Sequence, residues 1–348
     1  MYYLYNTRQM KNNARKILLV ILMIVGFSCV GIAQQEAQYT QYMFNRLVYN
    51  PGSAGSSGSI ALSAMYRNQW MGLKLDAPTT DVLPGSAPVN YFFSFDMPVK
   101  FLHGGLGLSA YVDAIGYRKN TNLCLDYAFR MFWGSGNLSA GIEAGLLNTT
   151  LDGSQLRGSD DLPGQIGASG SNAGDPLLTG KEESDMLFDV SIGLYYQVPG
   201  VYYVGFSAKN LLAAKSATLN YQNARTFYLM GGYDYALPLD PSFKLKPSAM
   251  VKTANFSNFQ GEVSCLLEYQ SAVWGGLTYR VQDAVCLLAG IQWKKLRIGA
   301  AYDLTTSKIG GFKYTRSLGS LELYVRFCFK VIIPEKPTTH YRNTRYIF

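Results

Sequence analysis

Apolar and polar residues alternate along most of the chain, and this period of two is typical of β-strands with two different faces. In residues 122–131, leucine and aromatic side chains alternate with Asp126 and Arg130. Near the end of the chain, Leu323 and its apolar neighbours alternate with Glu322 in the same way. The charges fall on one face each time. This pattern favours an all-β, transmembrane antiparallel barrel whose apolar face meets lipid and whose polar face lines a lumen.

We predict about 14 strands from this pattern. Their ranges are 58–68, 88–98, 104–114, 121–132, 137–148, 186–198, 201–210, 224–236, 243–253, 259–270, 273–280, 284–293, 295–304 and 318–330. Outer-membrane barrels have short periplasmic turns and long outer loops. Counted from a periplasmic N-terminus, the long connections 69–87, 149–185, 211–223 and 305–317 all fall on the outer side.

The rival architecture is a soluble β-sandwich or a periplasmic barrel with an apolar core. Here the charged positions share their face with glycines and small residues, which suits a confined lumen. Aromatic residues also gather near strand ends, as interfacial girdles require. The predicted girdle residues are Tyr91, Phe92, Phe93, Tyr195, Tyr196, Tyr202 and Tyr203. Both features favour the membrane barrel.

The start of the sequence predicts export. Four basic residues precede an apolar run over residues 17–30, and small residues lead to Ala33. This order is typical of a secretory signal peptide, so residues 1–33 are predicted to be removed, with the mature chain in the outer membrane of a Gram-negative bacterium. A lipidated Cys29 is the weaker alternative, because the residues before it form a poor lipobox.

The mature chain divides into three predicted parts: an opening segment 34–57, a barrel 58–331 and a tail 332–348. The opening segment is amphipathic, and Asn50-Pro51-Gly52 is expected to turn the chain into the first strand. This segment is expected either to plug the periplasmic mouth or to act as a cap that only closes the core.

The tail has two alternative roles. Its basic residues Arg342 and Arg345 are suited to bind a periplasmic partner or another component of a larger machine. The terminal Phe348 instead matches the signal by which bacterial barrels are recognised for assembly, although it follows a tail and not a strand. The two roles differ in whether barrel abundance depends on the tail.

The charge and the cysteines argue against several classes of function. The net charge falls from +8 to +4 once the four basic residues of the leader are removed, which gives little support to nucleic-acid binding. The remaining cysteines lack C-x-x-C spacing, so neither a metal site nor thiol redox activity is predicted. We expect mostly free, buried thiols. They are Cys124, Cys265, Cys286 and Cys328.

An enzyme is also not predicted. The two histidines are His103, in a predicted periplasmic turn, and His340, in the tail. Barrel hydrolases hold their catalytic histidine near the outer leaflet, where neither residue can reach. The sequence has no phosphate-binding loop, dinucleotide fingerprint or zinc spacing, so no cofactor is expected.

Charged side chains on the polar face are expected to pair across the lumen. Arg67, Gln69 and Trp70 lie at the outer end of the first strand, where a structural role is favoured over a binding role. Candidate partners are the acids Asp126, Glu262, Glu268, Asp303 and Glu322 and the arginines Arg130, Arg280, Arg297 and Arg326. The pattern does not choose among these pairs.

Several blocks resemble the PorP/SprF family of outer-membrane proteins of Bacteroidetes type IX secretion and gliding systems. These blocks include 38–45, Asn50-Pro51, 66–72, 274–280 and 296–308, with Tyr-Arg-Asn-Gln-Trp the most specific. The resemblance spans nearly the whole mature chain. The motif residues carried forward as partner-binding or structural are Tyr42, Phe44, Asn45, Asn50, Pro51, Arg67, Gln69 and Trp70, with Arg342 and Arg345 from the tail.

The resemblance implies a role in exporting or anchoring secreted proteins that carry a dedicated C-terminal domain, for example a gliding adhesin. The expected partners are outer-membrane lipid, such a secreted protein, and other secretion components at the periplasmic face. A passive diffusion channel is the alternative, because the predicted lumen is polar.

Overall fold

The computed structural model of the chain describes residues 38–72, 74–75, 87–153, 181–219, 221–238, 240–306 and 315–330. The predicted signal peptide, the centre of the connection 149–185 and the tail with Arg342 and Arg345 lie outside the described residues. No helix in the described part of the chain is long and apolar enough to cross a bilayer.

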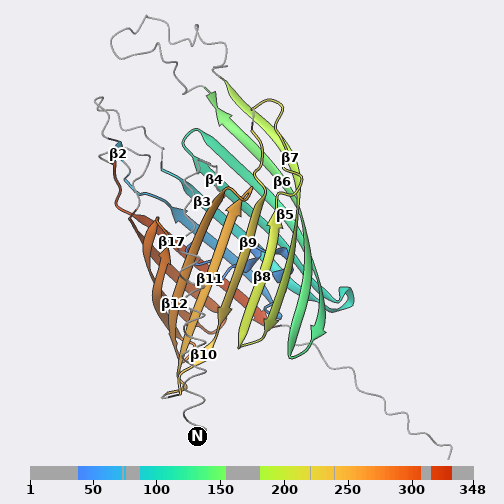
Figure 1. Cartoon of the computed structure of the whole chain (residues 1–348), viewed down its shortest axis with the longest axis vertical. Helices are drawn as coiled ribbons and strands as arrows, with labels where there is room; N and C mark the ends of the chain where they lie inside the picture. Colours follow the sequence, from blue (N-terminus) through green and yellow to red (C-terminus); the bar gives the residue numbers. More distant parts are fainter. Residues whose placement is uncertain are drawn as a thin grey trace, which may run out of the picture.

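Fourteen long strands of the described chain form a closed antiparallel barrel (Figure 1). They are β1 Ser59–Asn68, β3 Val89–Val99, β4 Gly104–Ile115, β5 Arg118–Trp133, β6 Gly136–Asp152, β7 Glu182–Val198, β8 Tyr202–Lys209, β9 Thr226–Tyr233, β11 Phe243–Ala254, β12 Asn258–Tyr269, β13 Val273–Arg280, β14 Ala284–Trp293, β15 Leu296–Thr305 and β17 Ser320–Lys330. Each predicted strand is confirmed, with ends shifted by a few residues.

Small elements accompany the barrel. The pair Tyr235–Ala236 (β10) continues the line of β9 along β11, and Lys74–Leu75 (β2) pairs with Thr315–Arg316 (β16). Three short 3-10 turns are η1 Arg46–Val48, η2 Pro51–Ser53 and η3 Lys100–Leu102. Only η1 and η2 lie in the segment that precedes β1.

The barrel closes between its first and last strands. β1 pairs with β3 on one side and with β17 on the other, from Ser59 opposite Lys330 to Asn68 opposite Leu321. Closure leaves no unpaired strand edge, which is what a bilayer demands of a β-structure because its interior offers no water to edge groups. The register also places Arg67 directly opposite Glu322.

The two faces of the wall follow the predicted alternation. Leu125 and Leu323 on the outer face are 58% and 44% exposed, whereas Asp126 and Glu322 on the inner face are 0% exposed. An outer face of large apolar side chains is suited to lipid, and the inner face carries the charges. This arrangement confirms the membrane barrel.

The two ends of the barrel differ in their connections. At one end, which we call the turn end, the connections are short, such as 134–135 and 294–295. All of the long connections lie at the other end, the loop end, together with the short turns 116–117, 255–257 and 281–283. By the rule for outer-membrane barrels, the turn end faces the periplasm. β7 extends well past β8 at the loop end and pairs with β6 up to Asp152 (Figure 1). Residues 149–152 and 182–185 therefore belong to strands and not to the predicted loop.

Some predicted side-chain positions were wrong. Phe92, Tyr195 and Tyr203 are buried and face the lumen, because each lies on the opposite parity to an exposed girdle neighbour such as Tyr91. The expectation of buried thiols holds for Cys124 and Cys286. It fails for Cys265, which is exposed, and for Cys328, which is half-buried, although all four thiols are free.

Candidate functional site

An N-terminal segment, residues 38–58, runs through the lumen from near the loop end to the turn end. At one end, the Thr40 hydroxyl donates to the Asp303 carboxylate near the loop end of β15. At the other end, the Gly55 amide donates to Asp96 near the turn end of β3 at 3.2 Å. The segment thus occupies much more of the lumen than either alternative from the sequence, a plug in the periplasmic mouth or a cap that only closes the core.

Apolar side chains of this segment are buried against the inner wall. The buried ones are Tyr39, Tyr42, Met43, Phe44, Leu47 and Tyr49. Burial raises the pKa of the Tyr42 and Tyr49 phenols well above the ordinary value, with a further contribution from the Glu262 charge, so both stay neutral. The segment therefore forms a core inside the barrel.

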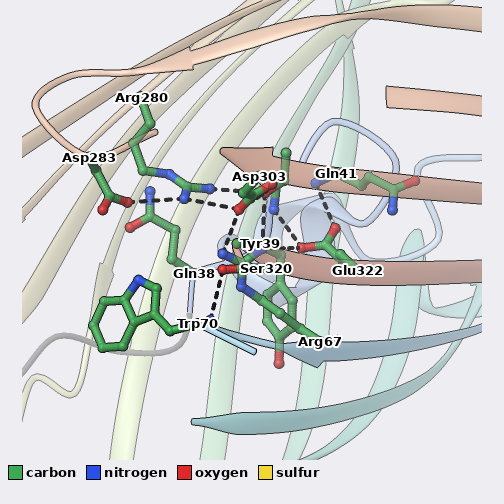
Figure 2. A network of polar contacts seen from close by, with 12 residues as sticks. Gln38, Tyr39, Gln41, Arg67, Trp70, Arg280, Asp283, Asp303, Ser320 and Glu322 are labelled. Atoms are coloured by element: carbon green, nitrogen blue, oxygen red, sulfur yellow. Dashed lines mark hydrogen bonds and ion pairs between the residues drawn. The ribbon is translucent and has the colours of Figure 1, made fainter. Parts of the chain in front are cut away.

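The Thr40 hydroxyl lies at the centre of a buried ionic network at the loop end. Figure 2 shows Arg67, Arg280, Asp303 and Glu322 of this network. Thr40 Oγ1 accepts from Arg67 Nη1 and from Arg280 Nη2, each at 3.0 Å, and donates to Asp303 Oδ1 at 2.9 Å. A hydroxyl has one proton and two lone pairs, and these contacts use all of them. Arg67 Nη2 also binds Asp303 Oδ2 directly at 2.6 Å.

Glu322 fastens the backbone of the segment to the same network. Its two carboxylate oxygens accept from the Thr40 amide at 2.7 Å and the Gln41 amide at 2.9 Å, and it pairs with Arg67 at 3.1 Å. Figure 2 shows Gln41 and Arg67 on either side of this carboxylate. Buried charges need such partners because the protein interior solvates them poorly. Without the segment, the buried Glu322 carboxylate of the wall would lose two of its hydrogen-bond donors.

Phe44 forms the middle anchor. Its ring stacks on Tyr324, with centroids 5.8 Å apart, and lies 4.6 Å from the Trp274 ring. Its carbonyl oxygen accepts from the Tyr324 hydroxyl at 3.1 Å and from Arg326 Nη1 at 2.8 Å. Side chain and backbone are thus held by the same part of the wall.

Asn50 fixes the turn before β1. Its amide nitrogen donates to the carbonyls of Leu194 and Phe206 at 2.9 and 3.2 Å, and its Oδ1 accepts from the Gly52 amide at 2.8 Å. The turn lies so close to the wall that a Cβ on Gly193 would overlap Asn50 Oδ1. Glycine on the inner face of β7 is what admits the turn.

Replacing Gly193 with valine is therefore expected to push the Asn50 turn out of place and destabilise the barrel by roughly 1–3 kcal/mol, the usual cost of overpacking. The change in thermal midpoint of the detergent-solubilised barrel measures it. Gly200 lies in a turn where an added Cβ meets open space, but its φ of +74° disfavours a side chain. Ala300→Val, on the exposed face of β15, is therefore the control and should leave the midpoint nearly unchanged.

The structure brings most of the predicted motif residues to the segment and its surroundings. The Tyr42 hydroxyl donates to the Ser248 hydroxyl at 3.1 Å, and the side-chain amide of Asn45 donates to the Met65 sulfur at 3.5 Å. Gln69 and Trp70 instead follow β1 at the loop end, where the Trp70 amide donates to Ser320 Oγ at 3.0 Å. Pro51 opens η2.

The lumen pairs left open by the sequence are resolved in part. Glu262 pairs with Arg280 at 3.4 Å, and Arg297 lies 3.7 Å from Glu268. Arg130 binds backbone carbonyls of the segment instead of an acid. The lysines Lys209 and Lys246 were missed as partners, at 3.3 Å from Glu143 and 3.0 Å from Glu268. Both lysines lie at strand positions that alternate with outward-facing residues, and this pattern could have identified them as lumen side chains.

Asp126 lies in the wall of the barrel and His103 lies at its turn end. Asp126 lies opposite Glu143 in the β5–β6 register, so two acids face each other in the wall. His103 lies at the turn end between η3 and β4, as expected. Among the described residues, no group of three or more His, Cys, Asp or Glu side chains is placed to hold a metal ion.

The profile of a family described as type IX secretion system membrane protein PorP/SprF matches residues 31–327. The chain belongs to the PorP/SprF family. PorP/SprF membership and the barrel fold together place the chain in the outer membrane, as a protein of the type IX secretion system. No curated protein matched the sequence.

Solved structures similar to this PorP/SprF barrel include other outer-membrane barrels. The toluene transporter TodX of Pseudomonas putida is 10% identical, with 87% of this chain and 96% of that chain covered and a TM-score of 0.46. The CymD monoaromatic hydrocarbon channel is 12% identical, with coverages of 86% and 96% and a TM-score of 0.45. Omp33 of Acinetobacter baumannii is 6% identical, with coverages of 78% and 99% and a TM-score of 0.42.

Proposed function

We propose that this barrel acts in the export or surface anchoring of proteins that carry a type IX C-terminal domain, such as a gliding adhesin, through protein–protein contacts. Family membership supplies the secretion context. The observation that carries the scaffold role is the segment held across the lumen by Thr40, Arg67 and Glu322. A lumen occupied by its own chain is better suited to a docking scaffold than to free diffusion.

A pull-down tests this proposal. The tagged barrel is isolated from detergent-solubilised outer membranes, and bound proteins are identified by mass spectrometry, with an unrelated tagged barrel from the same cells as the control. The proposal expects a large secreted protein, bound through its C-terminal domain, or other secretion components. Recovery of the same proteins by the control barrel, or of none, would contradict it.

A passive diffusion channel is the second candidate, and a cavity of about 660 Å³ at the turn end of the lumen favours it. Planar bilayers separate the two functions. We expect purified barrels to give no steady current, because the segment fills the lumen between this cavity and the loop end. A stable ohmic conductance from the intact chain would instead support the channel.

We further propose that residues 1–33 are removed on export and that the tail 332–348 binds a periplasmic partner through Arg342 and Arg345. Removal of residues 334–348 is then expected to leave barrel abundance in the outer membrane unchanged while it reduces co-purification of periplasmic partners. Quantitative immunoblotting of membrane fractions measures abundance. Loss of the barrel itself would point to Phe348 as an assembly signal instead.

A further inference from the structure

The cavity at the turn end has walls from two sources. The N-terminal segment contributes Arg46 and Ser53, and the strand ends contribute residues such as Lys246 on β11 and Arg326 on β17. The β14–β15 turn, with Lys294 and Lys295, forms part of its rim. We call this cavity the vestibule. It lies at the end of the barrel that faces the periplasm, and the segment lies between it and the loop end.

The vestibule is strongly basic. Two acids line it, Asp96 and Asp234, and Glu268 lies just behind its wall, within 3.0 Å of Lys246. Six cations line it: Arg46, Lys246, Lys294, Lys295, Arg297 and Arg326. Positive charge is therefore in excess even when all three acids are counted.

The arginines of the vestibule are held mainly by neutral groups, and the carboxylates that pair with Arg297 and Arg326 lie 3.7 and 3.8 Å away. Arg46 donates to the Tyr195 hydroxyl at 2.5 Å, and its guanidinium lies 3.7 Å from the centre of the Tyr203 ring. Arg326 lies 3.8 Å from Asp96, and its side chain is 19% exposed. Neutral groups thus hold Arg46, and Arg326 has a single carboxylate partner. The six cations of the vestibule outnumber its acids and leave positive charge available to bind an anion.

The chemistry of the walls selects the ligand. The inner faces of the strands form the vestibule, so its main opening is toward the periplasm and not toward the acyl chains of the bilayer. The volume of about 660 Å³ exceeds what one small anion needs and lies within the range of sites that hold drug-sized ligands. Because its cations are spread over the walls, the vestibule matches a short chain with several carboxylates better than it matches a ligand with a single charge.

We propose that the vestibule binds an acidic peptide segment that enters from the periplasmic side. The site needs no assumption about which proteins the barrel serves in secretion, because it depends only on the charge and shape of the vestibule. Lys294 and Lys295 form an exposed rim that attracts the peptide first, and the arginines bind carboxylates deeper inside. Binding weakens as salt is added, since the rim charges are solvent-exposed.

Fluorescence anisotropy with a labelled hexaglutamate peptide tests the site on the full-length mature barrel in neutral detergent. Binding is expected to saturate at low salt, and a hexaglutamine peptide is expected not to bind. The double variant Lys294→Gln/Lys295→Gln is expected to weaken binding roughly two- to thirtyfold, the range for the loss of two exposed charge pairs. Arg297→Gln is expected to weaken binding as well.

The matched control is Arg118→Gln/Lys119→Gln, an adjacent basic pair at the loop end of β5, and it should leave the affinity unchanged. Compact migration of unheated samples in SDS gels verifies that each variant is folded. Three outcomes would overturn the proposal: no saturable binding, equal weakening by both double variants, or full displacement of the peptide by vesicles of phosphatidylglycerol. The last outcome would assign the basic rim to lipid headgroups.

Discussion

Replacing Arg67 with alanine is expected to lower the free energy of unfolding by roughly 3–5 kcal/mol, the usual cost of removing one partner from a buried ion pair. Arg67 binds Asp303 at 2.6 Å and Glu322 at 3.1 Å, and these side chains are at most 1% exposed. Without the guanidinium, Asp303 would keep Arg280, 3.4 Å away, whereas Glu322 would keep only the backbone amides of Thr40 and Gln41. The temperature at which the barrel loses its compact form in SDS gels measures the loss.

Two further variants make this test specific. Lys119→Gln removes an exposed charge at the loop end and should change the midpoint little, because exposed charges contribute little to stability. Glu322→Gln in the Arg67→Ala background should recover part of the loss, since it removes the carboxylate that is left without an ion pair. An Arg67→Ala barrel with the midpoint of the unchanged protein would contradict the network.

Removal of residues 38–55 is expected to have the largest effect on permeability, because it takes the segment out of the lumen and leaves a polar passage. Single-channel recording in planar bilayers should then show steady current steps that the full-length mature barrel does not give. The same deletion should lower the thermal midpoint, since Phe44 and its neighbours bury large apolar surfaces against the wall.

The control is removal of residues 157–174, a stretch of the same length from the connection between β6 and β7. This change leaves the segment and every contact described for it in place, so the bilayer should remain silent. Current steps from both deletions would show that the segment does not close the lumen. Silence from both would show that other parts of the chain close it.

The barrel was predictable because lipid imposes one simple pattern on every strand. The alternation around Asp126 and Glu322 identified the inner face, and short turns fixed the order of the hairpins. A tight turn also fixes register, so the pair of Glu262 and Arg280 across the 270–272 turn was available from the sequence. Successive residues of a strand face opposite sides of the sheet, and a strict application of this rule would likewise have predicted that Tyr195 faces the lumen.

The site was less predictable because its contacts join distant parts of the chain. Thr40 meets Asp303 and Glu322 across 263 and 282 residues, and local patterns carry no information about such pairs. The amphipathic opening segment fitted a mouth plug and a simple cap equally well. Only the position of the inner wall shows that Thr40 lies near the loop end while Gly55 lies at the opposite mouth.

The partners of Thr40 also constrain the order of assembly. Arg280, Asp303 and Glu322 come from β13, β15 and β17, which are among the last strands to be synthesised. Until β17 joins β1, the first residues of the segment have no complete set of ligands to receive them. The N-terminal residues can therefore bind fully to the inner wall only after the barrel has closed. A chain that stalls before its final hairpin would leave these residues accessible to proteases.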